Sequence, residues 1–234
     1  MDRGRRNYRQ YCGLAAALEV VGGRWTLLIV RELLLGPKRY GELLVALPGI
    51  GTNLLAERLK SLVERGVLRR VKSASAREQG YELTELGEQL RAPVLELARL
   101  GLAFVGPPSD DQVVRPQWAF LAVQALMEPE RAGQIDEAYE FHVDDAVFHI
   151  RVDGGVPRGI QGPFDGTPAV SVTTDSATFV EIGAKRLSPF EAVASGRLKL
   201  SGSPDAIMRF SILLGLAPDP AVAPVAAVPV SASS

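Results

Sequence analysis

A proline-rich break divides this sequence of 234 residues into two parts of similar length. The stretch VGPPSDDQVVRP, residues 105–116, combines two adjacent prolines, an acidic pair and a third proline, which is typical of a linker. We therefore expect a first domain over residues 1–105, a linker over 106–115 and a second domain over 116–216. The remaining residues, 217–234, are rich in Pro, Ala and Val with almost no charge, and predict a disordered tail.

The charges are divided between the same two parts. Residues 1–105 contain 17 Lys and Arg against 11 Asp and Glu, whereas the rest of the chain contains 9 against 16. A basic half joined to an acidic half suggests that the first half meets a polyanion. The alternative is a chance partition of surface charge.

Composition and the N-terminal segment argue against membrane and secreted classes of protein. No apolar run approaches the roughly 20 residues that span a bilayer, so no membrane partner is expected. The N-terminus, MDRGRRNYRQYC, has no apolar stretch before a cleavage site, which argues against a secretory signal. Cys12 is the only cysteine, so no intrachain disulfide can form, and a cytoplasmic location fits.

The first half alternates short apolar helices with glycine or proline breaks. This pattern predicts helices over residues 12–23, 24–36 and 38–47, and a fourth that starts after Gly51. Two alternating runs, GVLRRVKS and GYELT, flank a polar stretch and predict a hairpin. A helix over residues 84–105 follows, with Thr84 as its N-cap. This order predicts a winged helix-turn-helix domain.

The fourth helix lies in the stretch GIGTNLLAERLKSLVERGVLRRV and has two contrasting sides. At about 100° per residue, apolar side chains gather on one side for packing, namely Leu54, Leu55, Leu59, Leu62 and Val63. The opposite side is suited to a DNA major groove, because amide, carboxylate and methyl groups near the helix start can contact base edges. The DNA-binding candidates here are Thr52, Asn53, Ala56, Glu57 and Lys60.

Further candidates surround this helix and are suited to phosphate contacts. They open the preceding helix or lie on or near the hairpin, which forms the wing: Lys38, Arg39, Tyr40, Arg69, Arg70, Lys72 and Arg77. Arginine and lysine position a protein on the phosphate backbone, and Arg77 at the wing tip is placed to enter a minor groove. The plain alternative is a small helical domain with a solvated charged face.

Residues 12–104 resemble the HxlR family of winged-helix regulators, which are relatives of the MarR proteins. The resemblance rests on Cys12, GGRWTLLIVRELLLGPKRYGELLVALPGI, TNLLAERLKSLVERGVLRRV and YELTELGEQL, in this order. It implies bacterial or archaeal transcription control by homodimers that are built from the terminal helices and read two half-sites of operator DNA. It places Lys38, Arg39, Tyr40, Thr52, Asn53, Lys60 and the wing at DNA. Two departures are Gly51, where family members often have Ser, and AREQGYE in place of a proline-rich approach to the second wing strand.

Cys12 matches a family position at which some members sense oxidants or electrophiles by thiol chemistry. Arg9, with Arg5 and Arg6 nearby, is expected to favour the reactive thiolate. The alternative is a small buried hydrophobic residue on a dimer-forming helix.

The second half predicts an α+β domain. A helix over residues 116–127 precedes strands over 138–143, 146–155 and 168–175. Helices over 176–185 and 188–195, a strand over 196–202 and a helix over 203–215 follow, the last with Pro204 in its first turn. The fold class of the whole chain is therefore α+β, with a winged helix-turn-helix followed by a mixed sheet and helices.

This half resembles the sterol carrier protein 2 (SCP2) fold, through residues 173–210 and above all ASGRLKLSG followed by an acidic-capped apolar helix. The resemblance implies a mixed sheet with helices on one face and an apolar tunnel for a lipid or another hydrophobic small molecule. The tunnel candidates are Trp118, Leu121, Phe148, Phe179, Phe190, Ile207, Met208, Phe210 and Leu214. The same residues at this spacing also suit a plain hydrophobic core.

Other chemistry has little support in the sequence. His142 and His149 are the only histidines and lie seven positions apart on different predicted strands. Adjacent strands could bring them together at a metal, but without a nearby cysteine a metal site is not expected. The serines lack a G-x-S-x-G setting, and no P-loop or dinucleotide motif appears, so neither catalysis nor a cofactor is expected.

These patterns predict a homodimeric transcriptional regulator in the cytoplasm, associated with the nucleoid. Its winged helix binds operator DNA, and a hydrophobic effector bound in the second domain controls it. The alternative is a lipid or hydrophobic-ligand carrier that uses the winged helix for dimerisation. A third hypothesis, a weak hydrolase, has the least support because no catalytic constellation is visible.

Overall fold

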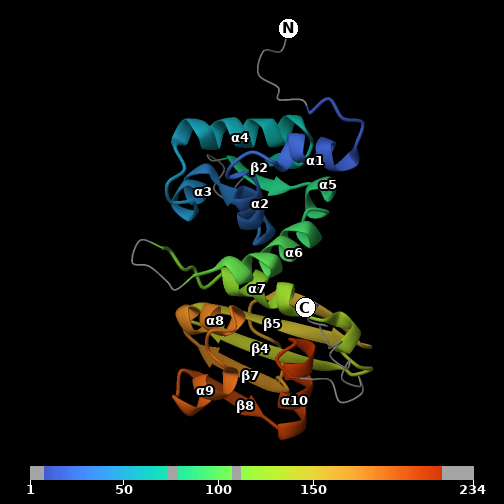
Figure 1. Cartoon of the computed structure of the whole chain (residues 1–234), viewed down its shortest axis with the longest axis vertical. Coiled ribbons are helices and arrows are strands. Elements are labelled where there is room, and N and C mark those ends of the chain that lie inside the picture. The colour runs from blue at the N-terminus through green and yellow to red at the C-terminus, as the bar shows by residue number, and fades with distance from the viewer. Residues whose placement is uncertain (1–7, 73–78, 107–111, 218–234) are drawn as a thin grey trace, which may run out of the picture. The chain divides into compact units, whose positions relative to one another are not determined.

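The computed structural model describes residues 8–72, 79–106 and 112–217 (Figure 1). The chain divides into two compact units. The first holds the chain up to Phe104 together with Ser109–Val113, and the second holds Val105–Pro108 and the chain from Val114 onward. Arg77 and the predicted tail from residue 218 lie outside the described residues. Within the described part no single helix is long and apolar enough to cross a membrane, and only the bent pair Gly13–Val21 and Thr26–Leu34 meets the requirement, by length and composition, across an 81° bend.

The first unit has the expected order of helices and hairpin (Figure 1). Its helices are α1 (Gly13–Val21), α2 (Thr26–Leu34), α3 (Tyr40–Ala46), α4 (Thr52–Glu64), α5 (Glu85–Glu88) and α6 (Arg91–Gly101), followed by the 3-10 turn η1 (Leu102–Phe104). Strands β1 (Lys38–Arg39), β2 (Leu68–Lys72) and β3 (Gln79–Leu83) form an antiparallel sheet in the order β1-β3-β2. The core lies between α2, α3 and α4 around Ile29, Leu33, Leu43, Leu55 and Leu59.

Two details of this unit differ from expectation. Residues 84–105 were expected to form one helix, but α5 and α6 are separate. Pro93 explains the break, because its ring clashes with the carbonyl four residues earlier and cannot lie inside a continuous helix. Lys38 and Arg39 also form a short strand against Tyr81 and Gly80, and Arg39 is the N-cap residue of α3.

The second unit contains one mixed sheet of five strands in the order β6-β5-β4-β7-β8. The strands are β4 (Glu137–Val143), β5 (Ala146–Asp153), β6 (Val156–Gln161), β7 (Val170–Thr174) and β8 (Leu198–Gly202). All pair antiparallel except β4 and β7, which are parallel. The helices are α7 (Trp118–Leu126), α8 (Ser176–Gly183), α9 (Pro189–Ala194) and α10 (Pro204–Leu213), and a 3-10 turn, η2 (Pro129–Arg131), follows α7.

Alternation along the strands separates a buried apolar face from a polar one. Tyr139, Phe141 and Val143 of β4 lie on the buried face, and Glu140 and His142 on the other. The buried face carries an aromatic cluster, in which Phe141 stacks on Phe148 at 4.9 Å between ring centroids and Phe210 of α10 lies 5.6 Å from Phe141. Helices cover only this face, as Figure 1 shows within the unit.

Strand β6 was not predicted. Pro157 and Gly159 interrupt its alternation, and both are residues that weaken a strand. Because β6 lies at the edge of the sheet, its outer hydrogen-bonding groups face no other strand and Pro157 is tolerated. A Cβ at Gly159 would come within 2.9 Å of the Gln124 side chain of α7, so the glycine allows this helix to approach the sheet.

Candidate nucleic-acid interface and ligand region

The two sides of α4 are divided as its sequence predicts. Leu55, Leu59 and Leu62 are buried, whereas most of the DNA-binding candidates are exposed, namely Thr52, Asn53, Ala56, Glu57 and Lys60. Gly51 is the N-cap residue and offers no side-chain cap, so the first amides of α4 have no acceptor from that position. The helix therefore presents open N–H groups and short polar side chains at its N-terminus.

Two of the three candidates at the start of α3, Arg39 and Tyr40, have local partners. The Tyr40 hydroxyl donates to the Thr52 carbonyl at 2.8 Å, which ties α3 to the first turn of α4. The Arg39 amide donates to the Glu42 carboxylate at 2.6 Å, and the Arg39 guanidinium holds the same carboxylate at 2.9 Å. These contacts with Arg39 hold the pKa of Glu42 below its ordinary value. Lys38 is half-buried on β1. The hydroxyl of Tyr40 thus already has a structural partner, the Thr52 carbonyl, in the absence of DNA.

The two arginines of the wing strand β2 differ in whether they form an ion pair. Arg69 forms an ion pair at 2.5 Å with Glu82 on the opposite strand. Arg70 and Lys72 are exposed, and neither forms an ion pair with any acidic side chain that the structure describes. Among the described residues of the wing, Arg70 and Lys72 are therefore the cations without an acidic partner.

Cys12 is exposed at the N-cap position of α1. The backbone N–H groups of Ala15 and Leu14 hold the pKa of its thiol below the ordinary value. This cause differs from the expected one, because Arg9 does not contribute and Arg5 and Arg6 lie outside the described residues. Within the single chain, Cys12 is not the small buried residue of the alternative reading.

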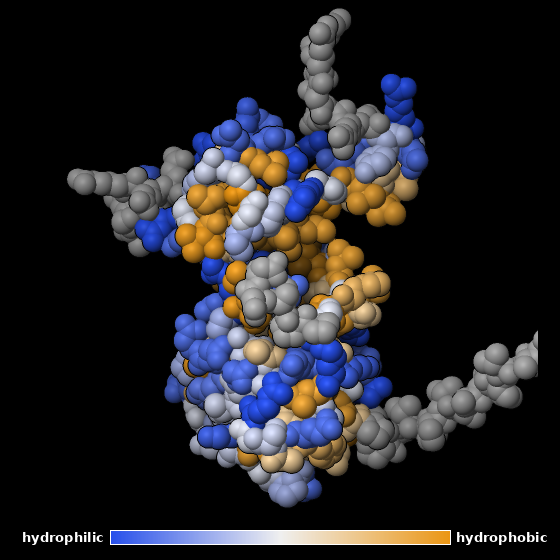
Figure 2. All heavy atoms as spheres, turned by 60° about the vertical axis from the view of Figure 1, so that its left-hand side comes forward, coloured by the Kyte–Doolittle hydropathy of each residue, from blue (hydrophilic) through white to orange (hydrophobic). Residues whose placement is uncertain are grey.

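Exposed apolar side chains lie on α1, on α6 and on η1, and we call this set of residues the α1/α6 surface. Its members are Leu14, Leu18, Leu97, Leu100 and Phe104, of which Phe104 is 80% exposed. Hydrophobic residues are visible over much of the first unit in Figure 2. Exposed apolar patches of this kind commonly mark protein interfaces.

The ligand candidates of the second unit fall into three groups. Four are core residues: Leu121, Phe148, Phe210 and Leu214. Three are half-buried: Trp118, Phe179 and Ile207. Phe190 on α9 and Met208 on α10 are 84% and 54% exposed, so they would reach a ligand only from the surface. Helices α8 and α9 each bury a single side chain, Thr178 and Ala192.

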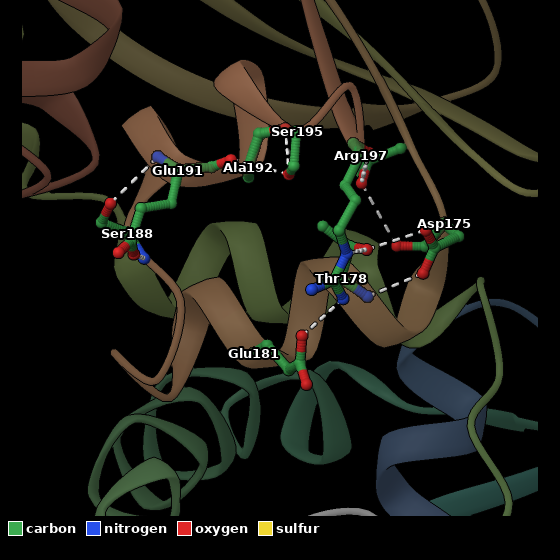
Figure 3. Close-up of polar contacts among 9 residues, drawn as sticks. Asp175, Thr178, Glu181, Ser188, Glu191, Ala192, Ser195 and Arg197 are labelled. Carbon is green, nitrogen blue, oxygen red and sulfur yellow. Dashed lines mark hydrogen bonds and ion pairs between the residues drawn. The ribbon is translucent and has the colours of Figure 1, made fainter.

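Helix α8 is held to the sheet by polar contacts (Figure 3). Asp175 caps it by accepting from the amide of Thr178 at 2.7 Å and from its hydroxyl at 2.8 Å. Arg197, just before β8, donates to the Thr178 hydroxyl at 3.1 Å and to Glu181 at 2.5 Å. Helix α9 has its own capping box between Ser188 and Glu191. Arg197 thus joins the chain before β8 to Thr178 and Glu181 of α8, whereas the polar contacts of α9 described here lie at its N-terminus.

The two histidines lie on the polar face of the sheet and have separate partners. His142 Nε2 lies 2.8 Å from Glu140, and His149 Nδ1 lies 2.9 Å from the Gly162 carbonyl. Burial tends to raise the pKa of Glu140, but the amide of Phe164 and the two histidines outweigh it, so this pKa is lowered. Across the described ranges, no group of three or more His, Cys, Asp or Glu is arranged to hold a metal.

Comparison with known proteins finds a family model that matches each unit. The model of the HxlR-like helix-turn-helix family matches residues 20–108, and that of the SCP-2 sterol transfer family matches residues 120–215. The HTH-type transcriptional regulator Rv3095 of Mycobacterium tuberculosis is 44% identical over 97 residues, which cover 39% of this chain and 61% of the relative. The HTH-type transcriptional regulator YodB of Bacillus subtilis is 35% identical over 95 residues, which cover 40% of this chain and 85% of the relative.

A solved structure of the reduced form of YodB from Bacillus subtilis has 32% sequence identity. It aligns with 43% of this chain and 100% of that chain, at a TM-score of 0.36. The mycobacterial relative extends well beyond the part that is matched, since the chain spans 61% of its length.

Proposed function

The chain belongs to the HxlR-like helix-turn-helix family, and from this premise we propose that it regulates transcription by binding double-stranded operator DNA. One observation carries the proposal. The N-terminal turns of α4 expose Asn53, Ala56 and Glu57 beside uncapped amides, while the other side of the helix is packed into the core. An amide, a methyl group and a carboxylate are suited to adenine, thymine and cytosine edges in the major groove. Such a regulator acts in the cytoplasm, at the nucleoid.

We propose that the DNA-binding form is a homodimer. The α1/α6 surface supports this, because it gathers five exposed apolar side chains on the first and last helices of the winged-helix unit. A second copy would bury these side chains and place two α4 helices on successive half-sites. The surface is self-complementary if α1 of one copy meets α6 of the other.

We propose further that the second unit binds a hydrophobic small molecule as effector. The loose packing of α8 and α9 supports this, since Phe179 is half-buried and Phe190 is exposed although both are large and apolar. A ligand between these helices and the sheet would bury both rings. Binding alters DNA affinity only if the ligand prefers one dimer geometry over another.

A second candidate function is a carrier of lipids or other hydrophobic ligands, with the winged helix serving dimerisation. The match of residues 120–215 to the SCP-2 sterol transfer family favours it. The two functions differ in one respect: the carrier needs no salt-sensitive, sequence-specific DNA binding.

The deciding experiment is fluorescence anisotropy of the full chain on DNA from upstream of its own gene. The titration is repeated over a range of salt concentrations and with an unrelated duplex. Tighter binding to the upstream DNA with a steep salt dependence supports the regulator. Equal, weak binding to both duplexes favours the carrier.

Effector control is tested by repeating the titration with saturating cis-parinaric acid, a fluorescent fatty acid. Fluorescence enhancement on mixing reports whether the acid binds. A change in affinity for the upstream DNA supports control by ligand, whereas bound acid with unchanged DNA affinity removes the proposed coupling.

A further inference from the structure

Arg58 on α4 connects this helix to a turn far away in the sequence. Its Nε donates to the carbonyl of Arg24 at 3.4 Å, and its Nη1 donates to the Glu57 carboxylate at 2.7 Å. Arg24 lies in the turn of residues 22–25, which joins α1 to α2. The Arg58 side chain is 25% exposed, whereas that of Glu57 is 67% exposed. Arg58 is thus mostly covered, unlike its neighbour on the predicted DNA-binding side.

Gly23 provides the space that the Arg58 guanidinium occupies. A Cβ built on Gly23 would lie 3.0 Å from Arg58 Nε, 3.3 Å from its Cζ and 3.1 Å from the Thr26 hydroxyl oxygen. Contacts this short require the guanidinium and the hydroxyl to give way by a few tenths of an ångström. The backbone of Gly23 does not require a glycine for its own conformation, because its φ is not in the left-handed region. The absence of a side chain at this position therefore leaves room for the Arg58 guanidinium beside Thr26.

The same turn meets the chain again just before α4. Trp25 has a φ of 76°, in the left-handed region that a bulky residue adopts only when its surroundings enforce it. A Cβ on Gly49 would lie 3.7 Å from the Trp25 ring, so the indole packs against the turn that precedes α4. The turn 22–25 therefore contacts α4 near its middle and the chain just before its start.

We propose that Arg58 is a positioning residue for DNA recognition, which locks α4 to the turn 22–25 and holds the Glu57 carboxylate in place for base contact. The DNA part of this proposal rests on the proposed function, and the lock itself does not. A positioning residue differs from a phosphate contact in its salt dependence. Loss of one phosphate contact reduces the slope of log affinity against log salt by about 1, whereas loss of a positioning residue leaves the slope unchanged.

The test uses two variants of the full chain that break the lock in different ways. Arg58→Met removes the guanidinium, and Gly23→Ala displaces it while every charge stays in place. The double variant completes a mutant cycle. Arg99→Met on α6 is the control, because it removes one cation from outside the predicted DNA-binding surface. If Arg58→Met does not fold, as circular dichroism would show, Arg58→Lys replaces it, since lysine keeps the charge without the planar fork.

Amide hydrogen exchange measures, without DNA, how firmly the contact between Arg58 and the turn 22–25 holds α4. We expect each single variant to speed exchange in residues 52–64 by about five-fold, and the double variant to add little, because both changes break one interaction. On the upstream duplex, we expect affinity to fall by about five-fold with an unchanged salt slope.

Three results overturn the proposal. The first is unchanged exchange of residues 52–64 in both single variants, and the second is a pair of effects that multiply in the double variant. The third is a salt slope reduced by about 1 in Arg58→Met, which would make Arg58 a phosphate contact. If the unaltered chain binds no DNA specifically, the proposed function fails, and hydrogen exchange still decides whether the lock exists.

Discussion

Single residues set where the elements of this chain begin, and Asp175 is one example at the residue scale. Burial alone would raise the pKa of its carboxyl, but the hydrogen bonds from Thr178 and the nearby Arg197 outweigh burial and lower it. Because the pKa is lower in the folded chain, Asp175 contributes stability that is present above its unfolded pKa. That contribution is lost as the pH falls through the folded pKa.

We expect Asp175→Ala to reduce the free energy of unfolding by about 1 kcal/mol at pH 7, since the N-cap of α8 is lost. The difference between this variant and the unaltered chain should shrink as the pH falls below the ordinary Asp pKa of about 3.9, because the carboxyl becomes protonated. Urea unfolding at several pH values measures both. Asp175→Asn keeps a capping oxygen without a titrating group, so it should remain stable and lose the pH dependence. A constant difference for Asp175→Ala at all pH values would contradict this account.

Substitution of two glycines by alanine is expected to change the stability of the fold in opposite directions. A Cβ on Gly87 would lie 2.2 Å from the carbonyl oxygen of Val67, the buried residue just before β2. Gly87→Ala should therefore lower the free energy of unfolding by about 1–3 kcal/mol. Nothing lies within 4 Å of a Cβ on Gly41 in α3, so Gly41→Ala should raise it by about 0.5–1 kcal/mol. Urea unfolding of both variants tests the pair, and equal effects would refute it.

At the scale of elements, ion pairs within the wing determine which of its cations are available to DNA phosphates. Arg69 is engaged by Glu82 across the hairpin, whereas Arg70 faces solvent without an acidic partner in the described part of the chain. We expect Arg70→Gln to weaken binding to specific and unrelated duplexes alike and to reduce the salt slope by about 1.

Arg69→Gln is the matched control for that prediction. It should change the slope less, because the neutralised Arg69 releases fewer counterions on binding. Anisotropy titrations over a salt series compare the two variants. A larger slope change for Arg69→Gln than for Arg70→Gln would show that the cross-strand pair opens at DNA.

At the scale of the whole molecule, assembly decides whether two α4 helices act together. Leu97 and Leu100 are 50% and 59% exposed on α6, within the α1/α6 surface. A charge at either position would be buried without a partner in a dimer. We expect Leu97→Glu to produce a monomer in sedimentation velocity and to weaken specific DNA binding by at least about ten-fold, since one half-site contact is lost.

Val193→Glu on α9 is the control, because it adds the same charge to an exposed apolar residue of the second unit. It should leave assembly and DNA affinity unchanged. A dimer that survives Leu97→Glu would place the subunit contact on another surface.

Residue patterns predicted most of the fold and several details of the candidate site. The two sides of α4, the cap at Thr84 and the start of α10 at Pro204 follow from spacing and local chemistry, and the structure has all of them. The patterns did not predict β6, because Pro157 and Gly159 do not have the alternation of a strand. The break between α5 and α6 was not predicted, although Pro93 in the sequence indicates that a continuous helix cannot run through this position.

The sequence by itself determined the α+β class, the division into two parts and the family of the first. These follow from periodicity, breaks and ordered motifs, which act within one stretch of chain. Only the tertiary structure decided which candidates are available. It pairs Arg69 with Glu82, ties Tyr40 to Thr52 and brings Arg58 over Gly23, 35 positions away in the sequence. The physical reason is that pairing and burial depend on neighbours in space, which local patterns do not specify.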